Sequence, residues 1–168
     1  VASMRNLNGG AVETDRDLTH SCIFGYRADN SLFYSGGEAP ELTWIDPGKT
    51  FLLSARLPQI DGTLQWQYAL GAEQLEIAVT LRTDEPLHSV FVNLPVFFNT
   101  QTALQGSFTT DRYIIRNGFS NMVLRWDAPA AAQLAESLPV GGNYGTADCL
   151  RIPLRAGRTT TITVSVQP

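Results

Sequence analysis

The stretch "QLEIAVTLR", residues 74–82, shows the pattern that decides the fold. Its apolar residues, Leu75, Ile77, Val79 and Leu81, alternate with polar or small ones. Successive side chains of a β-strand point to opposite faces, so these four residues share one face. The segment is therefore predicted to be an antiparallel strand with one face buried and the other facing water.

The same pattern recurs along the chain. Short segments rich in β-branched and aromatic residues are separated by turn-forming sequences at spacings of roughly 8 to 12 residues, which is typical of sandwiches and barrels. These segments include "ELTWID" (41–46), "KTFLLSARL" (49–57), "TLQWQYAL" (63–70), "RYIIRNG" (112–118) and "TTTITVSVQ" (159–167). The sequence predicts one domain over residues 1–168 with an all-β fold. We expect an antiparallel two-sheet β-sandwich of about ten to twelve strands.

One segment has helical composition. Residues 128–138, "APAAAQLAESL", are rich in alanine but have a weak apolar face, so they form either one short helix or a loop.

For the core we expect residues 74–82 and 88–94 to be neighbouring interior strands. The residues expected to be buried are Leu52, Ile77, Val79, Phe91, Leu94, Phe97 and Ile162.

The apolar stretch "LHSVFVNLPVFF", residues 87–98, raises the question of a binding surface. Val90 and Leu94 lie on one face of the predicted strand and Phe91 on the other, so it resembles a central strand covered on both sides. Pro95 has no N–H, which predicts that pairing is interrupted there by a bulge or an edge. A strand disturbed in its middle commonly aims side chains toward a concave surface. The plainer interpretation is a core strand.

Composition and charge exclude some classes of protein. The chain has 168 residues, a net charge of −4 and 12 scattered basic residues, which argues against a nucleic-acid surface. Charged residues make up 17%, below the roughly 25% of typical domains, so we expect part of the surface to rest against another domain. The absence of an apolar run of about 18 residues predicts no transmembrane helix.

The two cysteines and the first residues bear on cellular location. Cys22 and Cys149 form either a disulfide, which suits an oxidising compartment, or two buried thiols. Residues 1–10, "VASMRNLNGG", lack the basic and apolar regions of a signal peptide. A secretion signal would have been removed or would belong to a longer parent chain.

Motifs for catalysis or metal binding are missing from the sequence. There is no HExxH or CxxC spacing, nucleophile elbow or phosphate loop, so we expect no metal and no cofactor. His20 and Cys22 could form a nucleophilic pair, but residues two apart on a strand lack the mutual angle that a triad needs. The default role for His20 is structural. Most acids lie in turns, where aspartate serves the local backbone.

Exposed aromatic residues offer a different kind of site. The loop "FGYRADNSLFYSGG", residues 24–37, combines Tyr26, Asn30 and Tyr34, and Tyr144 lies in a second glycine-rich loop. Sugar rings present apolar C–H faces that stack on aromatic rings, and amides bond their hydroxyl groups. We therefore expect these four residues to contact a carbohydrate ligand.

The order of the chain's segments carries a resemblance to a known family. The segments are "THSCIFGYRADNSLFYSGGEAP" (19–40), "LQWQYALGAEQLEIAVTLRTDEPLHSVFVNLPVFFN" (64–99), "DRYIIRNGFSNMVLRWDAP" (111–129) and "LRIPLRAGRTTTITVSVQP" (150–168). Together they resemble the β-sandwich domain that follows a helical catalytic domain in bacterial polysaccharide lyases of the heparinase type. They are also similar to galactose-mutarotase-like and glycosidase accessory sandwiches.

This resemblance implies a module of a secreted or periplasmic bacterial protein that acts on polysaccharides. Some of these lyases contribute a histidine or tyrosine from this region, and His20 or Tyr26 would take that role here. The leading hypothesis is a non-catalytic module that contacts a polysaccharide or oligosaccharide and packs against another domain of its parent chain. The alternatives are a lyase domain that contributes a general acid or base, and a purely structural or adhesive domain.

Overall fold

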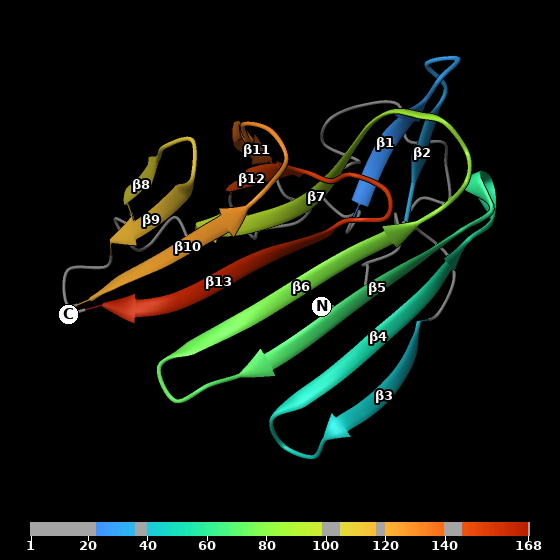
Figure 1. The fold of residues 1–168 in the computed structure, drawn as a ribbon. Helices are drawn as coiled ribbons and strands as arrows, with labels where there is room; N and C mark the ends of the chain where they lie inside the picture. Colours follow the sequence, from blue (N-terminus) through green and yellow to red (C-terminus); the bar gives the residue numbers. More distant parts are fainter. Residues whose placement is uncertain (1–22, 36–39, 99–104, 117–119, 140–145, 168) are drawn as a thin grey trace.

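The computed structural model describes residues 23–35, 40–98, 105–116, 120–139 and 146–167. Over these residues the fold is an all-β sandwich of two antiparallel sheets (Figure 1), as predicted. The described residues form thirteen strands, one more than the upper expectation, and their one helical element is the 3-10 turn η1 (Pro58–Ile60).

The smaller sheet has five strands in the order β11-β12-β7-β1-β2. Their bounds are β1 (Ile23–Arg27), β2 (Leu32–Tyr34), β7 (Leu87–Phe98), β11 (Gln133–Pro139) and β12 (Thr146–Pro153). The larger sheet has eight strands in the order β3-β4-β5-β6-β13-β10-β9-β8. Their bounds are β3 (Glu41–Asp46), β4 (Thr50–Leu57), β5 (Gly62–Leu70), β6 (Gln74–Arg82), β8 (Gln105–Phe108), β9 (Arg112–Arg116), β10 (Asn121–Asp127) and β13 (Thr159–Gln167).

The core lies between the two sheets, where every second residue of each strand points inward. In the larger sheet Ile77 stands opposite Ile162, and both are buried, as the alternation predicted. In the smaller sheet Val92 stands opposite Ile152, and both are fully buried. The two inner faces together form one continuous apolar cluster.

A hydrogen bond also joins the sheets at one end of the sandwich. Tyr113 of β9 is fully buried, and its hydroxyl donates to Asp148 Oδ2 of β12 at 2.6 Å. A buried phenol needs such a partner because leaving its O–H without one costs free energy. The bond therefore fixes how the edges of the two sheets sit relative to each other.

The prediction that residues 74–82 (β6) and 88–94 (in β7) form neighbouring strands is wrong. β6 pairs with β5 and β13 in the larger sheet, whereas β7 pairs with β1 and β12 in the smaller one. The short link between them crosses from one sheet to the other instead of closing a hairpin. Thr83 holds this link, because its hydroxyl donates to the Ile60 carbonyl at 2.6 Å and accepts from the Glu85 amide at 3.0 Å.

The predicted core is partly confirmed. Ile77, Val79 and Ile162 are buried, and Leu94 is half-buried against the core. Leu52 and Phe91 are half-buried but lie on the outer faces of their sheets, since their neighbours in sequence point inward. The side chain of Phe97 lies outside the described set.

Pro95 does not interrupt the ladder between β7 and β12, contrary to the expected bulge. The Leu154 amide donates to the Val90 carbonyl at 2.8 Å. Hydrogen-bonded and non-hydrogen-bonded pairs alternate, so in this ladder the pairs formed by even-numbered residues are the hydrogen-bonded ones. Pro95 stands opposite Cys149 at a pair that needs no N–H from either strand. The proline is tolerated there because it removes no bond from this ladder.

The segment 128–138 is neither a helix nor only a loop. Residues 133–139 form β11, where Leu134 stands opposite the fully buried Leu150. Pairing with β12 outweighs the helical propensity of a few alanines, which is a weak local preference.

No helix in the described part of the chain is long and apolar enough to span a membrane. Cys149 is buried, and its disulfide with Cys22 stays a prediction because Cys22 lies outside the described residues.

We expect Ile162→Ala to lower the free energy of unfolding by about 2 to 5 kcal/mol, because it leaves a cavity in the closed centre of the core. Leu52→Ala removes a similar volume from the outer face and should cost about 1 kcal/mol or less. Urea unfolding followed by tryptophan fluorescence would measure both. Equal costs for the two variants would contradict the assignment of inner and outer faces.

Candidate functional site

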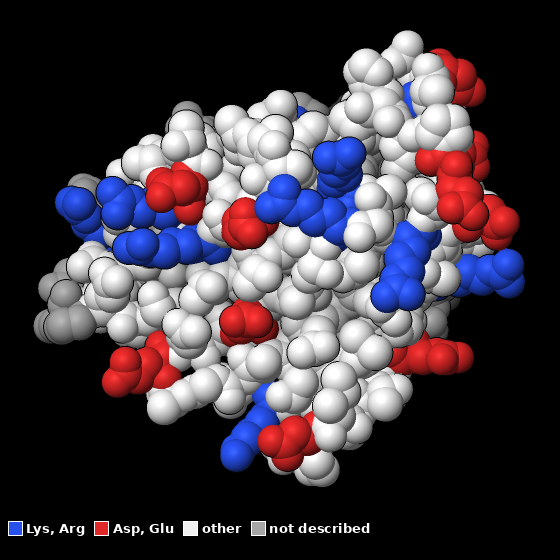
Figure 2. All heavy atoms as spheres, viewed as in Figure 1, with Lys and Arg blue, Asp and Glu red and all other residues white. Residues whose placement is uncertain are grey.

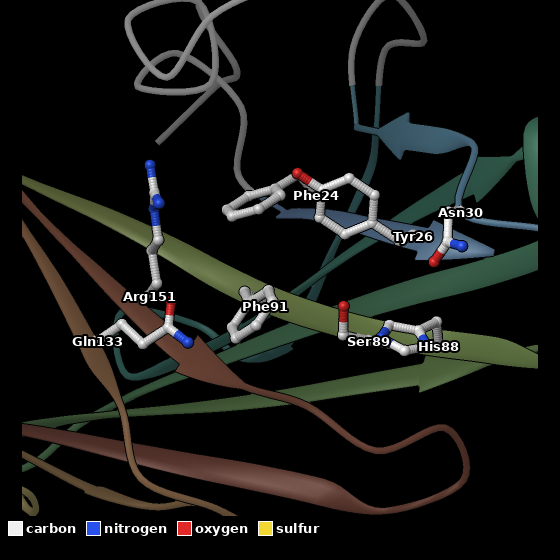
Figure 3. Close-up of a pocket in the computed structure, with 8 residues that line it drawn as sticks. All are labelled: Phe24, Tyr26, Asn30, His88, Ser89, Phe91, Gln133 and Arg151. Atoms are coloured by element: carbon white, nitrogen blue, oxygen red, sulfur yellow. The ribbon is translucent and has the colours of Figure 1, made fainter. Parts of the chain in front are cut away.

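The outer face of the smaller sheet carries a hollow of about 420 Å³ (Figure 3). Its walls come from β1, the β1–β2 turn, β7, β11 and β12. The described residues that line it are Phe24, Tyr26, Asn30, His88, Ser89, Phe91, Gln133 and Arg151. The hollow thus brings together side chains from segments far apart in the sequence.

Two stacked phenylalanines form the apolar part of the hollow. Phe24 of β1 stands directly opposite Phe91 of β7, and their ring centroids are 5.3 Å apart with an interplanar angle of 26°. Both point outward because Ile23 and Val92, which form the next pair in the ladder, point into the core. Offset stacking of this kind is favourable and holds both rings in place.

Gly25 allows the site strand β1 to approach its neighbours closely. A Cβ at this position would lie 2.5 Å from the Ser89 carbonyl oxygen and 2.7 Å from the ring of the buried Phe33. Both distances are shorter than any ordinary contact, so a larger residue would push the strands apart. Glycine therefore keeps Phe24 and Tyr26, on either side of it, in contact with β7.

A β-bulge aims two polar residues of β7 into the hollow. The register passes from Tyr26 opposite Ser89 to Arg27 opposite Leu87, which leaves His88 as an extra residue. Leu87 still packs against the core, while His88 and Ser89 both line the hollow (Figure 3). Bulges often redirect side chains in this way beside functional sites. The disturbance that the sequence placed at Pro95 is thus found at the start of the strand.

Arg151 and Gln133 form the opposite wall. They stand opposite each other in the β11–β12 ladder, on the outer face of the sheet. The Arg151 guanidinium lies over the ring of Phe24, 5.3 Å from its centroid, which is a cation–π contact. The contact orients the planar guanidinium beside the aromatic surface, where its N–H groups can donate to an oxygen-rich ligand.

A rigid turn presents Asn30. The backbone of Asn30 is left-handed with φ of 63°, and its amide donates to the Arg27 carbonyl at 3.0 Å. Asp29 accepts bonds from the Ser31 hydroxyl at 2.6 Å and the Ser31 amide at 2.9 Å. These two bonds, the side-chain one foremost, hold the pKa of the Asp29 carboxyl below its ordinary value.

The turn is also anchored to the larger sheet. Arg27 donates from Nε to the Gln59 carbonyl of η1 at 3.0 Å and lies 3.8 Å from Glu85 Oε1. The Gln59 side chain accepts from the Tyr34 amide at 3.3 Å. The base of the β1–β2 hairpin is therefore fastened to η1, and Asn30 at its tip has a defined position.

The structure places some of the predicted site residues together. Tyr26 and Asn30 both line the hollow. Tyr34 lies on the same outer face, opposite Phe24 in the β1–β2 ladder, but it is not among the lining residues. His20 and Tyr144 lie outside the described residues.

Sequence reasoning missed most of the lining residues. Phe91 carried a usable signal, because its outward position follows from the alternation of its strand. His88 gave no such signal, since regular alternation assigns it to the inner face and the bulge reverses this. Arg151 lies on β12, which pairs with β7, and Gln133 lies on β11, which pairs with β12; both pairings are visible only in three dimensions.

The chemistry available in the hollow is stacking and hydrogen bonding. No carboxylate belongs to its described lining, so a pair of acids for glycoside hydrolysis is not assembled there. Within the described residues, no three His, Cys, Asp or Glu side chains group so as to hold a metal ion. Tyr26 and His88 are the lining residues able to transfer a proton.

No known protein family matches this sequence, and no curated protein shows a significant match to it. The function therefore has to be inferred from the hollow itself.

We expect Ser31→Ala to raise the pKa of Asp29 toward its ordinary value, because the alanine removes the strongest bond to the carboxylate. In the wild type, folding lowers the pKa of Asp29. The ionised carboxylate therefore stabilises the turn fully when the pH is above the ordinary pKa of an aspartate. That support is lost as the pH falls through the lowered pKa. A carboxyl-detected NMR titration would measure the shift. Ser54→Ala, in β4, is the control and should leave Asp29 unchanged.

Proposed function

We propose that this chain is a non-catalytic β-sandwich module of a carbohydrate-active protein and binds a polysaccharide or oligosaccharide in the hollow. The observation that carries the proposal is the half-buried ring of Phe91, which the buried Phe24 holds in place, with hydroxyl and amide groups at its border. Pyranose rings have this mixed character, with apolar C–H faces and a rim of hydroxyl groups.

The polar border suits the rim of a sugar. Tyr26 and Ser89 supply hydroxyl groups that donate and accept, and Asn30 and Gln133 supply amides that do the same. Arg151 adds a fixed donor, which also suits the carboxylate of an acidic sugar. A ligand with many hydroxyl groups can pair with several of these groups at once.

The size and openness of the site favour binding of a short segment of glycan. A hollow of about 420 Å³ lies in the range of small-molecule sites, which is roughly 300 to 1,000 Å³. Asn30 and His88 at its border are exposed, so the ligand stays in contact with water and binding is weak. A longer chain can leave the hollow on either side.

A lyase domain is the second candidate, and one observation favours it. Tyr26 and His88 share the hollow with Arg151. A tyrosine or histidine could abstract the proton next to a sugar carboxylate while the guanidinium neutralises that carboxylate. His20 was the other residue considered for this role, and it lies outside the described residues. A purely structural or adhesive domain is the third candidate. For each of them we retain the expected secreted or periplasmic bacterial setting.

The binding proposal predicts that Tyr26 contributes more to the affinity for the ligand than Tyr34 does. Screening a sugar array and titrating the best ligand by calorimetry should give binding that Tyr26→Ala weakens roughly tenfold. Tyr34→Ala is the matched control, since Tyr34 lies on the same face outside the hollow. Equal losses in both variants would place the ligand elsewhere on the sheet. No binding of any glycan by the folded wild type would leave the structural-domain hypothesis.

The non-catalytic part of the proposal is tested by a different readout. Incubation with acidic polysaccharides should give no increase in the absorbance of unsaturated uronates. Turnover that is lost in Tyr26→Phe, His88→Ala or His20→Ala would replace the proposal by the lyase candidate. Tyr26→Phe keeps the ring for stacking, so loss of turnover without loss of binding would identify a proton-transfer role.

A further inference from the structure

The outer face of the larger sheet carries two arginines directly opposite each other. Arg112 of β9 stands opposite Arg125 of β10. Both point away from the core, because their neighbours in sequence, Tyr113 and Trp126, are buried in it. Like charges at directly opposite positions destabilise a sheet, so the fold alone gives no reason for this pair.

The pairing geometry brings the two side chains close together. The Trp126 amide donates to the Asp111 carbonyl at 3.3 Å, so these two residues belong to a hydrogen-bonded pair. Such pairs alternate with non-hydrogen-bonded ones along an antiparallel ladder, which makes Arg112 and Arg125 a non-hydrogen-bonded pair. The Cα atoms of such a pair are about 4.5 Å apart, and its side chains lie closer than those of the other kind. Both guanidinium groups can therefore reach a single ligand.

The protein itself does not neutralise the pair. Within the part of the chain that the structure describes, neither arginine forms an ion pair or a hydrogen bond. The acids closest to them in sequence have other partners: Asp111 accepts from the Thr109 hydroxyl at 2.9 Å, and Asp127 accepts from Arg158 at 3.1 Å. The arginines are thus not explained as members of a structural ion pair.

The surface around the pair is basic and rich in hydroxyl groups. Arg116 points from the same face of β9, four residues beyond Arg112. Figure 2 shows basic side chains gathered at this end of the molecule. Thr163 of β13 stands opposite Arg125, and Ser165 follows it on the same face. The outward positions of β9, β10 and β13 hold no aromatic ring.

The charge of the pair selects a class of ligand. Two guanidinium groups carry two positive charges, and a phosphate monoester carries about −1.5 to −2 at pH 7 on three acceptor oxygens. A carboxylate, a sulfate ester or a phosphodiester carries a single negative charge and would neutralise only one arginine. The planar guanidinium also matches the phosphate group, because it can donate two parallel hydrogen bonds to its oxygens.

The groups beside the pair indicate what carries the phosphate. The hydroxyl groups of Thr163 and Ser165 can donate to and accept from the hydroxyl groups of a sugar. A nucleotide base would find no ring to stack on at these outward positions. We therefore propose that Arg112 and Arg125 bind the phosphate group of a phosphorylated sugar. This site lies on the other sheet from the hollow, and the proposal does not depend on what the hollow binds.

Two matched sugars test the charge of the ligand. Glucose 6-phosphate and glucose 6-sulfate share the sugar ring and differ by about one charge at pH 7.5. An NMR titration that follows the amides of β9 and β10 measures both affinities and locates the site. We expect the phosphate to bind roughly fivefold more tightly than the sulfate, and the difference to shrink with added salt.

Single charge removals separate the site from general attraction of anions. Arg125→Gln removes one charge of the pair at an exposed position, and it should lower the affinity for the phosphate to that for the sulfate. Arg82→Gln is the matched control. Arg82 is also exposed on the outer face of the larger sheet, but it stands opposite Thr63 and not opposite another arginine. Its removal should leave both affinities unchanged, and the amide spectra report whether each variant is folded.

Several outcomes would overturn the proposal. These are equal affinities for the two glucose esters, equal losses in Arg125→Gln and Arg82→Gln, or no shift of the β9 and β10 amides with either sugar. Inorganic phosphate that binds as tightly as glucose 6-phosphate would make the free anion the ligand instead. A phosphoserine peptide that binds more tightly than glucose 6-phosphate would make a phosphorylated protein the ligand.

Discussion

Side chains alternate between the two faces of each strand, and this alternation governs the rest of the structure because the residues that fill the core fix which residues point outward. In β7 the inward positions are taken by Val90 and Val92, so Ser89 and Phe91 must point outward. The hollow is therefore a by-product of building the core, because the same alternation that fills the core sets the outer surface. The unequal widths of the sheets have the opposite effect, since Trp44 of β3 lies on the inner face of the larger sheet and is still exposed.

The fold was predictable because it depends on a periodic signal. The alternation around Ile77 and Ile162 specifies which face is buried, and both residues are buried as expected. The partner of each strand was not predictable in the same way. A short polar link such as the one at Thr83 suits a hairpin as well as a crossing between sheets, and its bond to Ile60 forms only in the assembled sandwich. Segment 128–138 likewise becomes a strand only because β12 is there to pair with it.

The residues of the candidate site were likewise predictable only in part. Tyr26 and Asn30 were recognisable from their loop, since aromatic and amide groups among turn residues are typical of exposed contacts. His88 was not, because a bulge of one residue reverses the face to which a side chain points. Arg151 reaches the hollow through two ladders, β12 with β7 and β7 with β1. Features that depend on one irregular residue or on distant pairing leave no local pattern in the sequence.

The interleaving of the two sheets along the chain has a consequence for how the protein is made. β1 pairs locally with β2 but finds its second ladder partner only when Ser89 to Val92 have been synthesised, and β6 pairs with β5 long before β13 is made. Such distant pairings cost loop entropy before they give any stabilisation, so folding of this topology is slow. On the ribosome, Phe24 and Phe33 leave the exit tunnel long before either can be covered. Apolar surface that stays exposed in this way favours aggregation, so the order of the strands makes synthesis the vulnerable stage for this fold.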